Sequence, residues 1–67
     1  MITLNEMIER YKEYYRDHIA FKNFGASDYA RGINNGHLQE LQFVFKVVYG
    51  LTNRDIERIH TEVLKEG

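Results

Sequence analysis

The sequence predicts an all-α fold: a small antiparallel three-helix unit that forms a single domain of 67 residues. Three observations lead to it. Apolar residues recur at helical spacing in three stretches, the chain contains no proline, and Gly25 and Gly50 separate the stretches. Connections this short favour antiparallel packing of neighbouring helices. A core of this size is marginal and, without cysteine, cannot be supported by disulfides.

The first helix is expected over residues 4–24. Thr3 and Glu6 have the spacing of a capping box at its start, and Gly25 provides a stop at its end. The charged residues, Lys12 and Arg16 among them, lie opposite a single apolar arc and are expected in solvent. That arc consists of Leu4, Met7, Ile8, Tyr11, Tyr14, Tyr15, His18, Ile19 and Phe21.

The second helix is expected over residues 28–49, with Ser27 as its N-cap. Its early part has low helix propensity, and residues 34–36 (Asn-Asn-Gly) are also typical of a turn, so a start near Gly36 is the alternative. From Gly36 on it is apolar on nearly every side. We therefore predict that this is the central helix of the fold, with two faces to cover.

The two faces of this helix are assigned different roles. The face around Leu41 should receive the other two helices and contains Ala30, Leu38, Val44, Phe45 and Val48. The other face is predicted to contact a second chain as a dimer or partner interface, unless the third helix wraps round to cover it. It consists of Tyr29, Gly32, Gly36, Phe43 and Val47.

The third helix is expected over residues 53–65. Thr52 and Asp55 repeat the capping-box spacing, and Leu51 and Ile56 occupy the positions of a hydrophobic staple. Its apolar arc consists of Ile56, Ile59, His60, Val63 and Leu64.

The three histidines, one per helix, do not predict a metal site. In an antiparallel bundle His18, His37 and His60 fall at different heights, so each is expected to be partly buried and hydrogen-bonded locally. Glu57 and His60 have the Glu-x-x-His spacing of di-iron bundles, but a single copy lacks the second motif and the further inward carboxylates. No metal or other cofactor is predicted.

Residues 50–59 (Gly-Leu-Thr-Asn-Arg-Asp-Ile-Glu-Arg-Ile) resemble the first helix of a helix-turn-helix unit of the response-regulator effector type. That resemblance implies a following recognition helix that reads the major groove, and only residues 60–67 remain to form it. The cations interleaved with Tyr11, Tyr14 and Tyr15 face away from those tyrosines, which argues against a base-stacking surface. Nucleic acid is therefore an unlikely partner, and a dimeric nucleic-acid-binding regulator is the alternative function.

Enzymatic activity is not predicted. No Ser, His and acid have nucleophile spacing, no glycine-rich phosphate loop is present, and there is no cysteine. The net charge is -1 and the pI near 6.3, without the basic excess that steers proteins to nucleic acid or anionic lipid. The N-terminus carries acids rather than a basic start and an apolar stretch, so a cytoplasmic protein without membrane contact is expected.

The function predicted is that of a small non-enzymatic protein-binding factor, an inhibitor or regulator of a larger protein, which forms a homodimer through the second helix. A structural or assembly component is a weaker alternative. In brevity and in its use of Asn, Ile, Lys and Tyr the chain resembles small accessory proteins of bacteriophages or prophages, which implies a phage- or prophage-encoded factor.

Overall fold

The computed structural model describes residues 2–66, which form three α-helices. They are α1 (Leu4–Phe24), α2 (Asp28–Val47) and α3 (Asn53–Glu66). No strand occurs within residues 2–66, so the predicted all-α three-helix unit is confirmed.

The helix starts are fixed by side chains that satisfy free backbone N–H groups. The Thr3 hydroxyl accepts a hydrogen bond from the Glu6 N–H at 3.1 Å, and the Ser27 hydroxyl accepts one from the Ala30 N–H at 3.1 Å. Before α3 the capping box is reciprocal: the Asp55 N–H donates to Thr52 Oγ1, and the Thr52 N–H donates to Asp55 Oδ2. The hydrogen bonds that the Thr52 N–H and hydroxyl donate to the carboxylate lower the pKa of Asp55.

The turn after α1 depends on a left-handed backbone. Gly25 has a φ of 88°, which other residues rarely adopt, and its N–H closes the helix onto the carbonyl of Phe21. Gly50 also has a positive φ, 67°, in the connection from α2 to α3, and the N–H of the following Leu51 donates to the carbonyl of Phe45.

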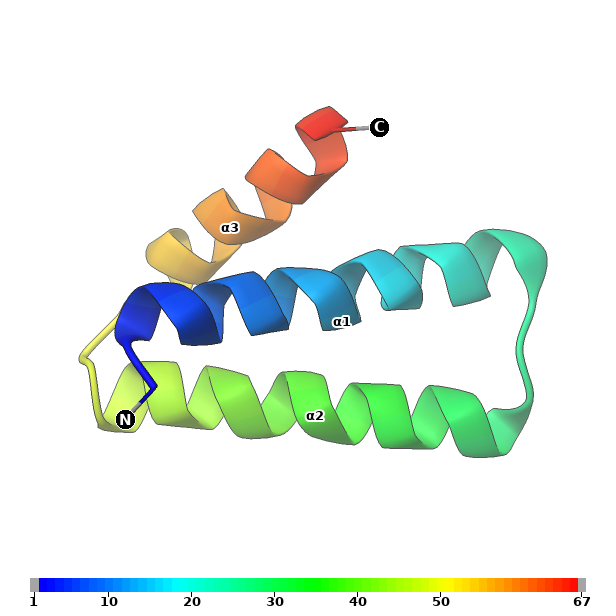
Figure 1. The fold of residues 1–67 in the computed structure, drawn as a ribbon, viewed down its shortest axis with the longest axis horizontal. Coiled ribbons are helices and arrows are strands. Elements are labelled where there is room, and N and C mark those ends of the chain that lie inside the picture. Colours follow the sequence, from blue (N-terminus) through cyan, green and yellow to red (C-terminus); the bar gives the residue numbers. More distant parts are fainter. Residues whose placement is uncertain (1, 67) are drawn as a thin grey trace.

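The first helix, rather than the second, lies at the centre of the fold. Figure 1 shows α1 between α2 and α3, with α3 inclined to the other two helices. α1 packs against both partners, whereas α2 and α3 make little direct contact. The expectation that α2 is the central helix is therefore wrong. The one-sided apolar arc of α1 is wide enough to contact both α2 and α3.

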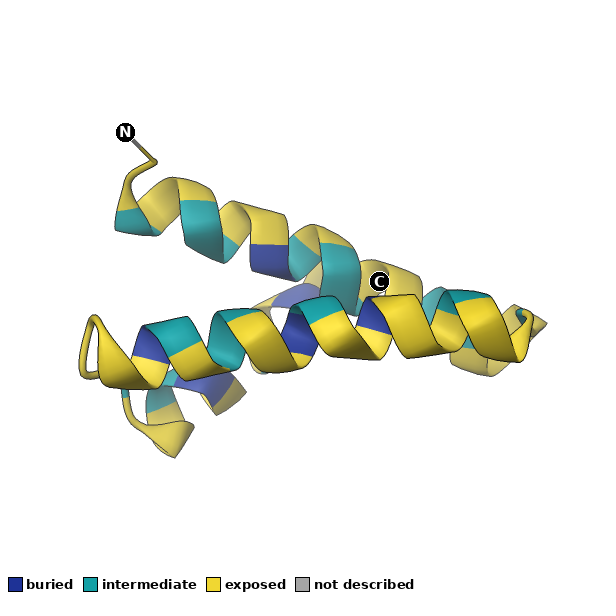
Figure 2. Ribbon diagram, turned by 90° about the horizontal axis from the view of Figure 1, so that it is seen from below, coloured by how far each residue is buried: buried dark blue, intermediate teal, exposed yellow. Residues whose placement is uncertain are grey.

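The core is small and aromatic. Tyr11 and Phe45 are fully buried, with ring centroids 5.5 Å apart in an edge-to-face arrangement. Figure 2 shows the buried residues as bands along the helices between long exposed stretches. The other members of this cluster are Leu38, Ile56 and Ile59, and Leu4, Met7, Ile8, Tyr14, Tyr15, Leu41 and Leu51 pack against it.

The structure shows where α2 begins and ends. Residues 34–36 are helical, so α2 continues from Asp28 without a turn. Asn34 supports this continuity because its side-chain amide donates to the Tyr14 carbonyl at 3.1 Å, which ties α2 to α1. At the other end, α2 stops at Val47, two residues earlier than expected.

Val48 is a correction to the predicted core. The sequence placed it with Leu41 and Phe45 on the face that receives the other helices, yet it is 68% exposed. It is the C-cap of α2, one residue past the last helical residue, Val47. Leu38 and Phe45 of the same predicted face are buried.

Candidate functional site

An exposed stripe runs along α2. All five residues of the predicted interface are exposed, and all but Gly32 lie on this stripe. Tyr29 is 80% exposed, Phe43 65% and Val47 64%, and Gly32 and Gly36 are exposed between them. The alternative, in which the third helix wraps round to cover these residues, is not what the structure shows, because α3 packs on α1.

The spacing of the stripe is heptad-like. Tyr29, Ile33, Gly36, Glu40, Phe43 and Val47, called the α2 stripe below, follow one another in steps of four and three residues, and all are exposed. This is the spacing of the seam along which two helices pack in a coiled coil. Ile33 is the one apolar member that the sequence reasoning missed. Its position, four residues after Tyr29 and three before Gly36, was the signal in the sequence.

Neither glycine of this surface is required by packing within the chain. A Cβ atom built at Gly32 or Gly36 meets no atom within 4 Å, and both have ordinary helical backbone. Glycine inside a helix costs about 1 kcal/mol relative to alanine. Contacts among residues 2–66 do not account for that cost.

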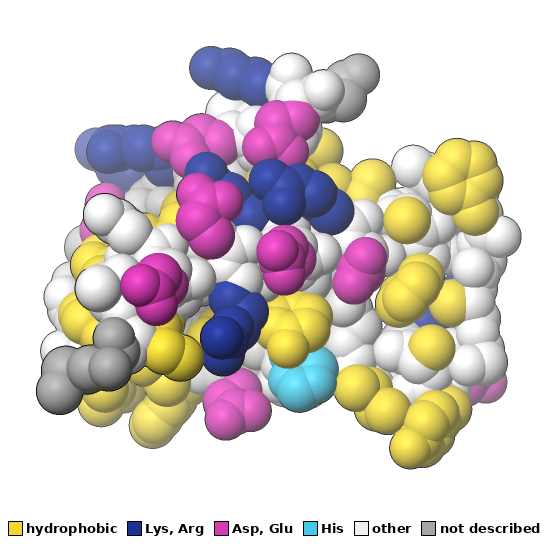
Figure 3. Space-filling view, in the orientation of Figure 1, with side chains coloured by type: hydrophobic (Ala, Val, Ile, Leu, Met, Phe, Trp, Pro, Cys, Tyr) yellow, Lys and Arg dark blue, Asp and Glu magenta, His cyan; other side chains and the backbone are white. Residues whose placement is uncertain are grey.

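The hydrophobic surface continues at both ends of the α1–α2 pair. Figure 3 shows hydrophobic side chains gathered at the two ends, with acidic and basic side chains interleaved between them. Phe24 is 88% exposed where α1 ends, and Val48 is exposed at the far end of α2. The apolar surface thus extends beyond the five predicted residues.

The opposite side of the molecule is closed by ion pairs between α1 and α3. Lys12 Nζ lies 2.9 Å from Glu62 Oε2, and Arg16 donates two hydrogen bonds to the Glu66 carboxylate at 2.8 and 2.9 Å. Both cations were expected on a solvated face, and Arg16 is exposed, whereas the Lys12 side chain is 14% exposed. These bonds raise the pKa of Lys12 and Arg16 and lower that of Glu66.

A polar network inside the bundle joins all three helices. The Gln42 side-chain amide donates to Tyr11 Oη at 2.8 Å, and Tyr11 Oη lies 2.6 Å from His60 Nε2. While the phenol oxygen accepts from Gln42, its own proton can be donated to Nε2 in the tautomer of His60 that carries its proton on Nδ1. Glu57 Oε1 lies 3.8 Å from that Nδ1.

Each histidine stacks against a tyrosine of α1. His60 stacks on Tyr15 with centroids 4.1 Å apart, His37 stacks on Tyr14 at 4.6 Å, and His18 stacks on Tyr15 at 5.9 Å. Within residues 2–66 no group of three or more His, Asp or Glu side chains is arranged to hold a metal ion. The stacking of His60 on Tyr15 was not predicted, because it depends on where α3 crosses α1.

The network predicts that stability depends on the protonation of His60. Burial lowers its pKa below 6.5, an effect that His18 strengthens and Glu57 opposes. As the pH falls through 6.5 the unfolded chain takes up this proton before the folded chain does, so the free energy of unfolding decreases. Once Nε2 of His60 is protonated, it can no longer accept a hydrogen bond from Tyr11 Oη.

Urea unfolding followed by circular dichroism at pH about 7.5 and about 5.5 measures this effect, because the two values bracket the ordinary titration range of histidine. The midpoint should be lower at the acidic pH. In His60→Gln the difference between the two midpoints should shrink. An equal difference in the variant and the parent chain would assign the pH dependence to other groups. Asp55 and Glu66 titrate in a more acidic range.

Comparison with known proteins gave no match among protein-family models, curated proteins or solved structures. In the part of the chain that the structure describes, no helix combines the length and apolarity needed to cross a bilayer.

Proposed function

We propose that the chain is a small non-enzymatic protein-binding factor that acts through the α2 stripe, and that the occupant of this stripe is a second copy of the chain. The observation that carries the proposal is the heptad spacing of exposed residues that include Tyr29, Phe43 and Val47. A large apolar surface on a small protein is an aggregation hazard unless a partner covers it. A self-complementary two-fold contact covers it with no further component.

The charge in the stripe favours antiparallel pairing of the two α2 helices. In a parallel pair in register, Glu40 would face Glu40 of the second copy, which is unfavourable. In an antiparallel pair centred on Gly36, Tyr29 faces Phe43 of the second copy, because both lie seven residues from the centre. Glu40 then faces Gly32, which has no side chain to obstruct it.

Charged residues beside the stripe also favour antiparallel pairing. Asp28 and Lys46 lie on one flank of α2, eight residues before and ten residues after Gly36. Antiparallel pairing brings them within about 3 Å along the helix axis, at 1.5 Å per residue, which suits an ion pair between the copies. It also brings Val48 of one copy toward the end of α1 in the other, where Phe24 is exposed.

The two glycines support close contact between the helices. Without side chains at Gly32 and Gly36 the backbones of two helices can approach each other more closely, which offsets the propensity cost of glycine through packing between copies. Phe43 then becomes a central anchor of the contact.

In this proposal the dimer inhibits or regulates a larger protein. The target, and an origin in a phage or prophage, stay predictions from the sequence. The nucleic-acid alternative gains no support from α1, because Lys12 and Arg16 are held by carboxylates of α3.

Introduced cysteines test the direction of pairing, because the natural chain has none. Equal amounts of Tyr29→Cys and Phe43→Cys chains, mixed under mild oxidation, should form a disulfide-linked heterodimer seen by mass spectrometry. Each variant alone should cross-link poorly, because its two cysteines lie at opposite ends of an antiparallel interface. A disulfide requires Cα atoms less than about 7 Å apart.

The control for this experiment is Leu64→Cys, an exposed position on α3 away from the stripe. It should cross-link no better than chance collision allows. Efficient cross-linking of Tyr29→Cys with itself would establish parallel pairing. Equal yields for all combinations, including Leu64→Cys, would contradict the proposed interface.

A further inference from the structure

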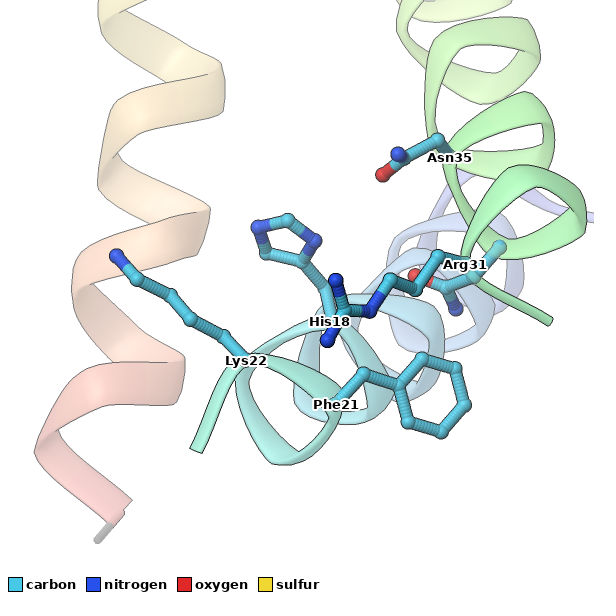
Figure 4. Close-up of a pocket in the computed structure, with 6 residues that line it drawn as sticks. His18, Phe21, Lys22, Arg31 and Asn35 are labelled. Carbon is cyan, nitrogen blue, oxygen red and sulfur yellow. The ribbon is translucent and has the colours of Figure 1, made fainter. Parts of the chain in front are cut away.

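A pocket between α1 and α2 lies on a different side of α2 from the stripe. It has a volume of about 230 Å³ and is lined by His18, Phe21, Lys22, Arg31, Asn34 and Asn35. The α1 residues come from its last two turns and the α2 residues from its first two. Figure 4 shows His18, Arg31 and Asn35 projecting into the space between the helices, with Lys22 extending from the rim toward α3.

The pocket is cationic and its charges are uncompensated. No carboxylate lines it. Within residues 2–66 neither Lys22 nor Arg31 takes part in an ion pair, in contrast to Lys12 and Arg16, which are paired with α3. An anion bound here would meet two positive charges and the imidazole N–H of His18 without competition from an acid of the chain.

Asn34 adds a hydrogen-bond acceptor without a partner. Its side chain is 5% exposed, and its Oδ1 is buried without any hydrogen bond. The amide orientation is fixed, because Nδ2 donates to the Tyr14 carbonyl at 3.1 Å and a flipped amide would place two acceptors together. A buried acceptor of this kind carries a desolvation cost until a donor reaches it.

We propose that this pocket binds a phosphomonoester group, either as inorganic phosphate or on a small organic molecule. The anionic oxygens are held by Arg31, Lys22 and His18, and Asn34 Oδ1 accepts the hydrogen bond of the P–OH group when the side chains adjust around the ligand. Phe21 offers apolar contact to an organic substituent. This inference does not depend on the dimer.

The unpaired acceptor gives the pocket its selectivity. A phosphomonoester has a second pKa of about 6, so near neutral pH part of it keeps a P–OH donor. Sulfate and phosphodiesters carry no such proton. They would present only acceptors to Asn34 Oδ1, and a nucleic-acid backbone, which consists of phosphodiesters, is disfavoured for the same reason.

Titration of the ¹⁵N-labelled full chain, followed by NMR at constant ionic strength and pH about 6.5, where a monoester is partly protonated, tests the proposal. Inorganic phosphate should give saturable shifts centred on His18, Asn34 and Asn35. Sulfate and dimethyl phosphate should bind about tenfold more weakly, which is the factor expected for one unpaired buried acceptor. Phenyl phosphate identifies the source: tighter binding than phosphate indicates an organic ligand, and equal binding indicates free phosphate.

Two exposed cations provide matched variants. Arg31→Gln should weaken phosphate binding about tenfold, the factor expected when one charge-assisted bond is lost, whereas Arg10→Gln, an exposed position on α1 outside the pocket, should change it less than about twofold. Both variants should keep the parent amide spectrum, which shows that they fold. Sulfate binding as tight as phosphate binding, equal losses in the two variants, or no saturable shift at millimolar phosphate would each overturn the proposal.

Discussion

Replacing Phe45 by alanine should remove a large part of the free energy of unfolding. Phe45 is fully buried and packs edge-to-face on Tyr11, the other fully buried large side chain. Phe→Ala in a core costs about 3–5 kcal/mol, and a domain of this length has a total stability of roughly 3–10 kcal/mol. Urea unfolding followed by circular dichroism would measure the loss.

Val48→Ala is the matched control for Phe45→Ala. The sequence placed both residues on one apolar face, but Val48 is exposed at the C-cap of α2. Its truncation should change the free energy of unfolding by less than about 0.5 kcal/mol, as surface substitutions usually do. Similar losses in the two variants would mean that the end of α2 is packed and the exposed position of Val48 is wrong.

Phe43→Glu should convert the proposed dimer into a monomer. Phe43 is 65% exposed in the single chain, so the substitution leaves the core intact and the helical circular dichroism spectrum unchanged. In the dimer the new carboxylate would be buried beside Tyr29 of the second copy and close to Glu40. Truncating a central anchor alone costs about 2 kcal/mol or more, and a buried unpaired charge adds to this.

Light scattering would show the change in mass, and Val47→Glu should act in the same direction. Leu64→Glu introduces the same charge at a residue of α3 that is 59% exposed and should leave the mass unchanged. If Phe43→Glu keeps the mass of the parent chain, the α2 stripe is not the interface.

Local signals in the sequence were sufficient for the helices and their starts. The hydroxyls of Thr3 and Ser27 and the Thr52–Asp55 box act between residues three apart, so no knowledge of the tertiary structure was needed to place them. The same holds for the turn at Gly25, where a positive φ selects glycine.

The same local signals do not show which helix packs against which. The second half of the second helix is apolar on nearly every side, which favoured this helix as the centre, yet α1 occupies that position. A helix needs apolar residues on one broad arc to contact two neighbours, not apolar residues all round. The inclination of α3, which brings Glu62 and Glu66 to Lys12 and Arg16, depends on long-range contacts that periodicity does not contain.

Of the two candidate surfaces, the sequence predicted the exposed face of α2 and did not predict the pocket. Periodicity predicted that Tyr29, Phe43 and Val47 share a face, and the structure leaves this face uncovered. The pocket near Arg31 was not predicted, because it depends on the pairing of α1 with α2 and on the single buried amide of Asn34. Asn34 in a stretch typical of a turn was the only local sign of it.

Sedimentation equilibrium of the unmodified chain tests the central claim most directly. Pairing of two copies through α2 predicts a species of about 16 kDa, twice the 8.0 kDa of the chain, at micromolar concentrations, where interfaces with a central aromatic anchor are commonly populated. A single species of 8.0 kDa that persists to millimolar concentration would contradict the proposal that the α2 stripe binds a second copy.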